Sequence, residues 1–237
     1  MIDVEKVSKD IGSKQIFNDI SLHCFAGETY ILVGANGIGK TSLLKSILSL
    51  YTIDGGHITI LGQNVDKRYK TNPDVGVFID SARMLPHDTV KRSLIFFASL
   101  YDKSLEDIDY LISALRVEDE LDKPYIALSS GNKRKLGLLI SLINNPSLII
   151  WDEPFASLDP EMCVELKELL ITLKQNGKTV LLTTNDLFYT QDIYDRVGFF
   201  LDSKTIIQKT RKELQEEYPL KTLNEIYFLI KNNYINQ

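Results

Sequence analysis

The stretch that decides the fold reads Gly34-Ala35-Asn36-Gly37-Ile38-Gly39-Lys40-Thr41-Ser42. It matches G-x-x-x-x-G-K-[ST], the phosphate-binding P-loop motif. Residues 28–33 before it look like a short buried strand, and residues 42–50 after it carry Leu and Ile at helical spacing. A strand, a glycine loop and a helix in this order are the context that the motif requires. The alternative is a glycine turn that happens to precede a lysine, and the two flanking elements argue against it.

The residues of this loop predict how it would hold a nucleotide. Its glycines allow the backbone to wrap closely around phosphates, with the amide N–H groups pointing inward. The helix that begins near Gly39 adds the positive end of its dipole. Lys40 is expected to reach the β- and γ-phosphates, and the hydroxyl of Thr41 is expected to ligate Mg²⁺. All nine residues of the stretch are therefore predicted to bind a nucleotide.

A second pattern, Ser147-Leu148-Ile149-Ile150-Trp151-Asp152-Glu153, is a buried-strand run that ends in two carboxylates. A carboxylate at the end of a neighbouring parallel strand lies where the Mg²⁺ of a bound nucleotide sits, so Asp152 is the predicted ligand of that ion. Glu153, one residue later, can polarise an attacking water as a general base. The alternative is an ordinary strand end with two solvated acids. The P-loop earlier in the same chain argues against this alternative.

A third pattern lies between these two and reads Leu128-Ser129-Ser130-Gly131-Asn132, followed by three basic residues and an apolar helical run. Taken alone, it indicates only a Ser/Gly helix N-cap. In the company of the P-loop, Asp152-Glu153-Pro154 and Ala156-Ser157-Leu158-Asp159, it resembles the LSGGQ signature of ATP-binding cassette (ABC) proteins. The resemblance covers Ile2 to about Leu229, and both the order and the spacing of the motifs fit it.

This resemblance implies an α/β fold in a single ABC ATPase domain over residues 1–237: a P-loop NTPase (RecA-like) core with a mostly parallel sheet, an N-terminal antiparallel β subdomain and an inserted α-helical subdomain. Residues 1–81 and 146–237 are expected to form the nucleotide-binding core, and residues 82–145 the helical subdomain that carries the signature. The alternation of strands and helices also favours a mostly parallel sheet. Strands are predicted over residues 56–62, 75–79, 147–152, 179–184 and 197–202, and helices over 89–101, 104–115, 130–144, 161–176 and 220–233.

The resemblance also implies a mechanism, with ATP and Mg²⁺ as the ligands. Two cassettes, either two copies or this chain with a different one, would meet head to tail. Ser129 and the amide of Gly131 would then contact the γ-phosphate held by the partner, because a helix N-terminus favours an anion. In transporters the other partner is a separate integral membrane permease, which would place this chain in the cytoplasm on the inner face of the membrane. Its docking surface is expected around Ser81–His87, with Phe96, Phe97 and Tyr101, unless the two phenylalanines fill the helical core.

Three positions depart from the family pattern. The aromatic residue that stacks on adenine aligns with Ile11, which has no ring, so Phe17 nearby is the candidate replacement. The Q-loop glutamine aligns with Asp80, a candidate contact to Mg²⁺ or the attacking water. In this feature the chain resembles exporters of antimicrobial peptides and antibiotics, which often carry an acidic residue at this position. The H-loop histidine aligns with Asn185, whose amide can donate one hydrogen bond but cannot carry charge. Hydrolysis is therefore expected to be retained, through Glu153, but to be slow.

Composition narrows the class of protein further. The chain has 237 residues and a formal net charge of −5, which argues against nucleic acid as the main partner. Cys24 and Cys163 are too few for a disulfide framework and are interpreted as reduced, small apolar side chains. We expect no targeting segment at the N-terminus, and no apolar run approaches the ~20 residues that span a bilayer.

The favoured interpretation is thus the ATPase subunit of an exporter for a peptide, an antibiotic or another hydrophobic compound. One alternative is an ATP-sensing clamp that dimerises and hydrolyses ATP weakly. The departures from the family pattern at Ile11, Asp80 and Asn185 favour this alternative. Another is a soluble ABC ATPase that is not tied to transport.

Overall fold

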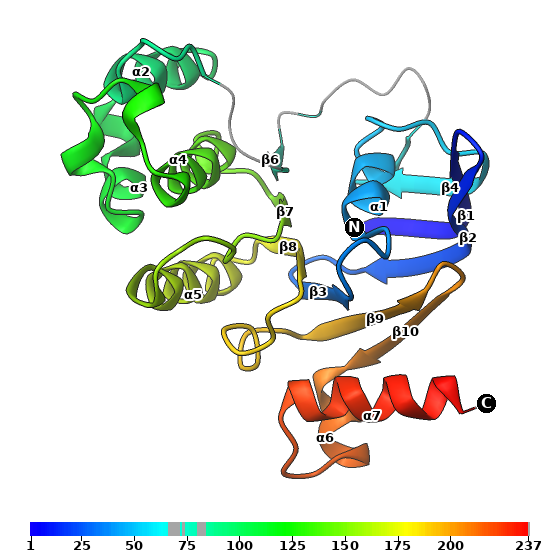
Figure 1. Ribbon diagram of the computed structural model, residues 1–237. Coiled ribbons are helices and arrows are strands. Elements are labelled where there is room, and N and C mark those ends of the chain that lie inside the picture. Colours follow the sequence, from blue (N-terminus) through cyan, green and yellow to red (C-terminus); the bar gives the residue numbers. More distant parts are fainter. Residues whose placement is uncertain (66–71, 73, 80–83, 237) are drawn as a thin grey trace.

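The computed structural model describes residues 1–65, 72, 74–79 and 84–236 (Figure 1). Its strands are β1 (Ile2–Ile11), β2 (Lys14–Cys24), β3 (Thr29–Gly34), β4 (Gly55–Ile60), β5 (Gln63–Asn64), β6 (Val75–Phe78), β7 (Leu148–Asp152), β8 (Thr179–Thr184), β9 (Arg196–Asp202) and β10 (Thr205–Thr210). Its α-helices are α1 (Lys40–Ile47), α2 (Val90–Ser99), α3 (Asp109–Ala114), α4 (Ser130–Leu142), α5 (Pro160–Gln175), α6 (Arg211–Glu217) and α7 (Leu223–Ile235), with short 3-10 turns η1 (Glu106–Ile108), η2 (Glu118–Glu120) and η3 (Tyr125–Ala127).

The central sheet has the order β10-β9-β3-β8-β7-β6, and its pairs are parallel except for β10 with β9. Strands β3, β7 and β8 are buried along their whole length, which is why they read as continuous apolar runs rather than alternating ones. Successive residues of β3 face two different cores. Ile31 and Val33 pack with α4 and α5, whereas Tyr30 and Leu32 pack with α1 and the N-terminal strands.

The second sheet is antiparallel, with the order β2-β1-β4-β5. Its apolar side chains, such as Val4, Leu22 and Ile58, share a core with Leu43 and Leu44 of α1. The predicted fold class is therefore confirmed: a mostly parallel α/β core stands beside an N-terminal antiparallel sheet.

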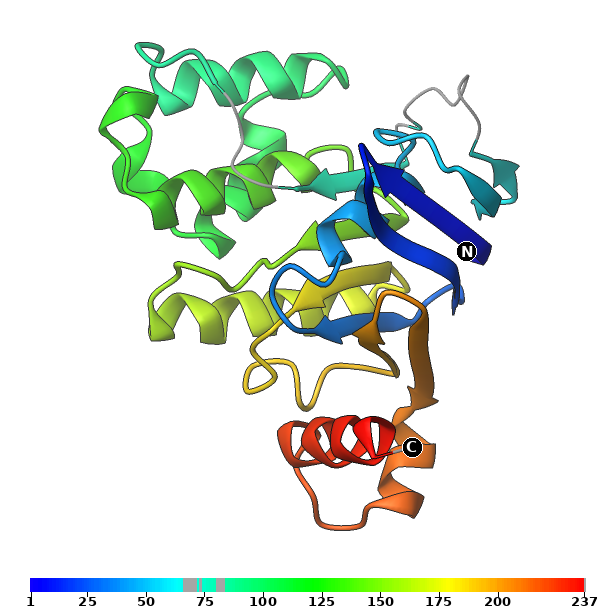
Figure 2. The same cartoon turned by 45° about the vertical axis from the view of Figure 1, so that its right-hand side comes forward.

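The helices between Val90 and Leu142 gather on one side of the molecule, away from the antiparallel strands (Figures 1 and 2). Thr89 caps α2 and Ser129 caps α4, each by accepting a hydrogen bond from the backbone N–H three residues later. The segment 104–115, predicted as one helix, is instead the turn η1 followed by the shorter α3. This block falls inside the predicted subdomain 82–145.

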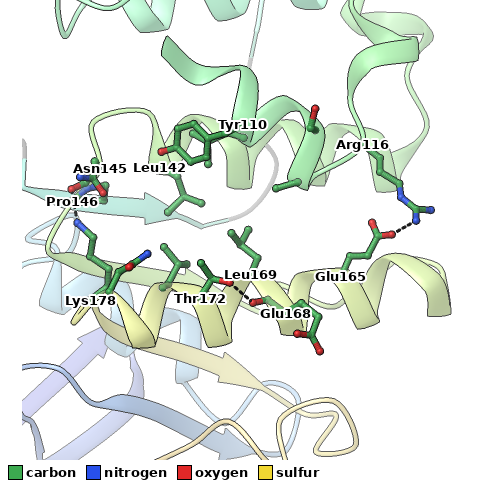
Figure 3. A pocket seen from close by; sticks show the side chains of 15 residues that line it. Tyr110, Arg116, Leu142, Asn145, Pro146, Glu165, Glu168, Leu169, Thr172 and Lys178 are labelled. Atoms are coloured by element: carbon green, nitrogen blue, oxygen red, sulfur yellow. Dashed lines mark hydrogen bonds and ion pairs between the residues drawn. The ribbon is translucent and has the colours of Figure 1, made fainter. Parts of the chain in front are cut away.

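A hollow of about 440 Å³ lies between α3 and α5, lined by Tyr110 and Leu169 among others (Figure 3). At one end Arg116 pairs with Glu165, and at the other Lys178 donates to the carbonyl of Asn145 at 2.8 Å. None of the residues that line it belongs to the predicted nucleotide site.

Candidate functional site

The P-loop connects the buried strand β3 to the start of α1, and its close packing requires small residues. A Cβ on Gly34 would lie 2.7 Å from the carbonyl oxygen of Phe200 in β9, so only glycine fits beside that strand. Gly39, which precedes α1, has a φ of 119°, a conformation that side chains rarely adopt. These two glycines turn the chain sharply, and the first N–H groups of α1 are presented at the carboxyl end of the sheet.

Lys40 is held inside this loop by groups on both sides. Its side chain is only 6% exposed, and its ammonium donates to the carbonyl of Gly34 at 2.8 Å. The same ammonium lies 3.1 Å from Oε1 of Glu153. The predicted phosphate ligand and the predicted base are therefore in direct contact.

Thr41 and Asp152 come together because β3, β8 and β7 are adjacent parallel strands that end at one edge. Thr41 Oγ1 donates to Oδ2 of Asp152 at 2.6 Å. The other carboxylate oxygen of Asp152 accepts from Thr183 Oγ1 at 2.5 Å. A Mg²⁺ ion takes one or two protein oxygens and completes its shell with water and phosphate oxygens. The adjacent oxygens of Thr41 and Asp152 fit such an ion, and the described residues contain no larger cluster of metal-binding side chains.

Both carboxylate oxygens of Glu153 have partners. Its Oε2 accepts from the backbone N–H of Asn185 at 3.1 Å, while its other carboxylate oxygen faces Lys40. The side-chain amide of Asn185 in turn donates to Oδ1 of Asn36 in the P-loop at 2.9 Å. Asn185, predicted to act near the γ-phosphate, therefore lies at the site and touches both the P-loop and Glu153.

The signature-like segment forms the N-terminus of α4. The Ser129 hydroxyl accepts from the N–H of Asn132 at 3.1 Å, and a Cβ on Gly131 would lie 3.0 Å from the carbonyl oxygen of Ser157. In the described part of the chain, no hydrogen bond joins Ser129 or Gly131 to the P-loop of the same molecule.

The structure describes two of the positions connected with the departures from the family pattern, Phe17 and Ile11. Phe17 as a replacement for the adenine-stacking ring is wrong, because the side chain is 0% exposed and packs in the core beneath the antiparallel sheet. Strand alternation turns the ring inward, so that Ile16 and one edge of the Phe17 ring both lie beside Gly39 of the P-loop. Ile11 is 45% exposed at the end of β1. Asp80 lies outside the described residues.

Two residues of the site were not predicted from the sequence. Thr183 bonds Asp152 through its hydroxyl, and the polar pair that ends the apolar strand β8 was the available signal. Arg134 of α4 donates to the backbone carbonyl of Glu153 at 2.6 Å. Nothing in its basic neighbourhood distinguished Arg134 from the lysines on either side.

A P-loop beside a strand-end aspartate and a glutamate, on this sheet, defines a nucleotide-binding protein of the P-loop class. A family model described as ABC transporter matches residues 17–156. Nod factor export ATP-binding protein I of Bradyrhizobium diazoefficiens is 33% identical over 231 residues, covering 95% of this chain and 76% of that protein. The protein of the same name from Rhizobium meliloti is 36% identical over 201 residues, covering 83% of this chain and 60% of that protein.

Solved structures agree on the fold. The ATP-binding subunit of an ABC transporter has a TM-score of 0.82 at 24% identity, covering 96% of this chain and 98% of that one. A dimeric ATP-binding cassette in a post-hydrolysis state, bound to ADP and phosphate, has a TM-score of 0.77 at 19% identity, covering 89% and 98%. This chain belongs to the ABC transporter family, as a nucleotide-binding subunit. Membership implies that it binds and hydrolyses ATP. Within the described ranges, every helix is too short or too polar to span a bilayer.

Proposed function

We propose that this chain hydrolyses ATP to power export through a separate membrane permease. The observation that carries the proposal is the convergence of Lys40, Thr41, Asp152 and Glu153, which are linked to one another within 3.1 Å although they come from two distant parts of the chain. Each side chain has the chemistry that phosphoryl transfer to water requires at that place.

The roles follow from the contacts. Lys40 and the amides of the P-loop hold the β- and γ-phosphates, and Thr41 with Asp152 holds Mg²⁺. The ion supplies positive charge that offsets the charge of the phosphate oxygens. Glu153 accepts the proton of the attacking water. Because Asn185 offers only a neutral donor in place of a histidine, we expect turnover to be slow. We also retain Asp80 as a candidate contact to the ion or the water.

A second cassette would complete the site. Ser129 and Gly131 lie at a helix N-terminus that does not meet the P-loop of its own molecule. We propose that they close over the ATP of a partner cassette, either another copy or a different chain. The dimeric cassette with ADP and phosphate supports this arrangement by its fold likeness.

The permease would dock on the helical block. A hollow of about 530 Å³ there is lined by residues that include Met84, Leu85 and Phe96. Leu85 is 69% exposed and Phe96 58% exposed, whereas Phe97 packs partly against the core. An apolar hollow of this size suits the insertion of a short helix from a partner. Phe96 is therefore proposed for docking, and Phe97 mainly supports it.

The direction of transport and the location of the chain follow from the same proposal. The curated relatives that are about one third identical are named as export proteins, and this chain spans between 60% and 76% of their lengths. We propose export of a peptide, an antibiotic or another hydrophobic compound, by a cytoplasmic subunit bound to the inner face of the membrane. The division into a core (1–81 and 146–237) and a helical subdomain (82–145) belongs to this proposal.

Two measurements test the function. The purified chain should release phosphate from Mg-ATP, and a stable ATP-bound dimer with no turnover would favour a clamp instead. Where a neighbouring gene encodes a multi-spanning membrane protein, co-expression with that protein should yield a complex, and Phe96→Glu should weaken the complex. A matched exposed phenylalanine outside the helical block, Phe228→Glu, should leave it intact. If the wild-type chain hydrolyses ATP but neither it nor the two variants form a complex with the membrane protein, the chain is a soluble ATPase.

A further inference from the structure

The backbone of Glu153 adopts a conformation that its residue type disfavours. Its φ is 47°, in the left-handed region that is unfavourable for a non-glycine residue. Such a turn persists only where neighbouring groups fix it. Here the N–H of Glu153 donates to the carbonyl of Thr183 at 3.1 Å and to its hydroxyl at 3.0 Å. The carbonyl oxygen accepts from Arg134 at 2.6 Å.

The guanidinium of Arg134 makes a second contact. Its central carbon lies 5.3 Å from the centre of the Phe78 ring, within the range of a cation–π interaction. Phe78 is 3% exposed and ends β6, where it pairs with Trp151 of β7. One side chain therefore joins helix α4, the end of strand β6 and the carbonyl of Glu153. The planar guanidinium of arginine can stack on a ring and donate to a carbonyl at the same time, whereas the ammonium of lysine cannot stack in this way.

We infer that Arg134 is a positioning residue that fixes the left-handed turn at Glu153 and so aims its carboxylate. This inference rests on the proposed role of Glu153 as the general base. A charge-assisted bond to the carbonyl stabilises the turn, and without it the residue can relax toward ordinary backbone angles, which swings the carboxylate away. Because α4 begins with the signature-like segment, Arg134 also links the position of that helix to the base. The contacts of Lys40 and Thr41 to phosphate and Mg²⁺ do not pass through Arg134.

The chain offers a matched control for this arginine. Arg211 of α6 donates to the carbonyl of Asp192 at 2.7 Å, and its guanidinium lies 5.7 Å from the centre of the Tyr194 ring. It makes the same two kinds of contact as Arg134, but neither contact reaches a residue of the proposed site. Arg134→Ala and Arg211→Ala therefore each remove one bond to a backbone carbonyl and one cation–π contact.

Steady-state phosphate release, ATP affinity by calorimetry and the thermal unfolding midpoint should be measured on both variants and on Arg134→Lys. For Arg134→Ala we expect kcat to fall about tenfold to a hundredfold, as for a misplaced catalytic group, with the ATP affinity changed less than about twofold. Arg134→Lys should be intermediate, and about 50 mM guanidinium should restore part of the activity of Arg134→Ala. Arg211→Ala should keep the wild-type kcat.

Each other outcome overturns the inference. A wild-type kcat in Arg134→Ala while Glu153→Gln is inactive would show that the base needs no such support. A loss of ATP affinity and thermal stability without guanidinium rescue would show a merely structural arginine. If Arg134→Ala does not fold, Phe78→Leu can be used instead, because it removes the ring contact alone. A wild-type kcat in both Phe78→Leu and Arg134→Lys would then contradict the inference. If Glu153→Gln itself turns over normally, the proposed base is wrong and the inference fails with it.

Discussion

The ammonium of Lys40 lies 3.1 Å from Oε1 of Glu153, so that the proposed phosphate ligand and the proposed base share one contact. A phosphate that binds Lys40 competes with the carboxylate for the same cation. The other carboxylate oxygen of Glu153 accepts from the N–H of Asn185, and this second bond does not involve Lys40. Substitutions of Lys40, Glu153 and Asn185 should therefore differ in how much they change the ATP affinity and how much they change kcat.

Lys40→Ala should abolish ATP binding at micromolar nucleotide. It removes a buried, charge-assisted phosphate contact worth about 1.5–3 kcal/mol, which is more than tenfold in affinity. Calorimetric titration with Mg-ATP measures the loss. Lys45→Ala is the control, because this lysine of the same helix faces the Tyr51 ring at 5.4 Å instead. Equal affinities for the wild type and Lys40→Ala would refute the P-loop assignment.

Glu153→Gln should keep ATP binding, stop hydrolysis and favour an ATP-bound dimer. The amide still accepts from the N–H of Asn185, but it cannot take a proton from water. Phosphate release and the mass in solution with ATP should be compared with the wild type. Unchanged turnover would mean that the base lies elsewhere.

Asn185→His should raise turnover. A histidine can donate a charge-assisted bond beside the γ-phosphate, and about 1.4 kcal/mol gained at the transition state corresponds to tenfold in rate. The exchange also breaks the amide bond to Asn36, so Asn185→Ala serves as the control for that loss alone. A histidine variant that is folded but slower than the wild type would show that the loop has adapted to asparagine.

Gly198→Ala should destabilise the fold without touching the site. The added methyl group would lie 2.2 Å from the hydroxyl oxygen of the fully buried Tyr30, so either this ring or strand β9 must shift. Overpacking of this kind costs about 1–3 kcal/mol, measured as the free energy of unfolding in urea. Tyr30→Phe in the same chain should recover part of the loss. Gly55→Ala is the matched control, since its nearest neighbour would be at 3.7 Å. Equal stabilities of the two alanine variants would contradict the prediction.

Cys24 should resist thiol reagents in the folded protein. Burial raises the pKa of its thiol from 9.0 to about 12, so the reactive thiolate is scarce at pH 8. Because the folded pKa is raised, the associated stability is fully present below pH 9 and is lost as the pH approaches 12. Burial also raises the pKa of Cys163. Labelling with a chromogenic disulfide at pH 8 should be slow until urea is added, and fast labelling of the native chain would contradict this.

The sequence predicted the elements whose signals are local. The strand over 179–184 was placed to the residue, and the helix over 161–176 is shifted by one because Asp159 caps it through a bond to the N–H of Met162. Long apolar runs with a cap leave little freedom in where an element begins. The P-loop with Asp152 and Glu153 was foreseeable for the same reason.

Contacts between distant segments were not foreseeable. Strand β10 is only half buried and carries a weak apolar pattern, so it was missed, as was α6, although Thr210 and Glu213 form a capping box. The bond of Asn185 to Asn36 spans 149 positions, and that of Arg134 to Glu153 joins a helix to a strand end. Residue types alone do not specify such pairs.

The sheet order also determines when the nucleotide site can form during synthesis. Strand β3 carries the P-loop, yet its two neighbours are β8 and β9, which follow much later in the sequence. A nascent chain leaving the ribosome therefore holds Thr29–Gly34 without a lateral partner until residues 179–202 have been made. Such late, non-local pairing folds slowly and leaves an apolar edge open to aggregation or to chaperones. The segment proposed to bind the phosphates is translated early, but it becomes competent only after residues 179–202 have been made.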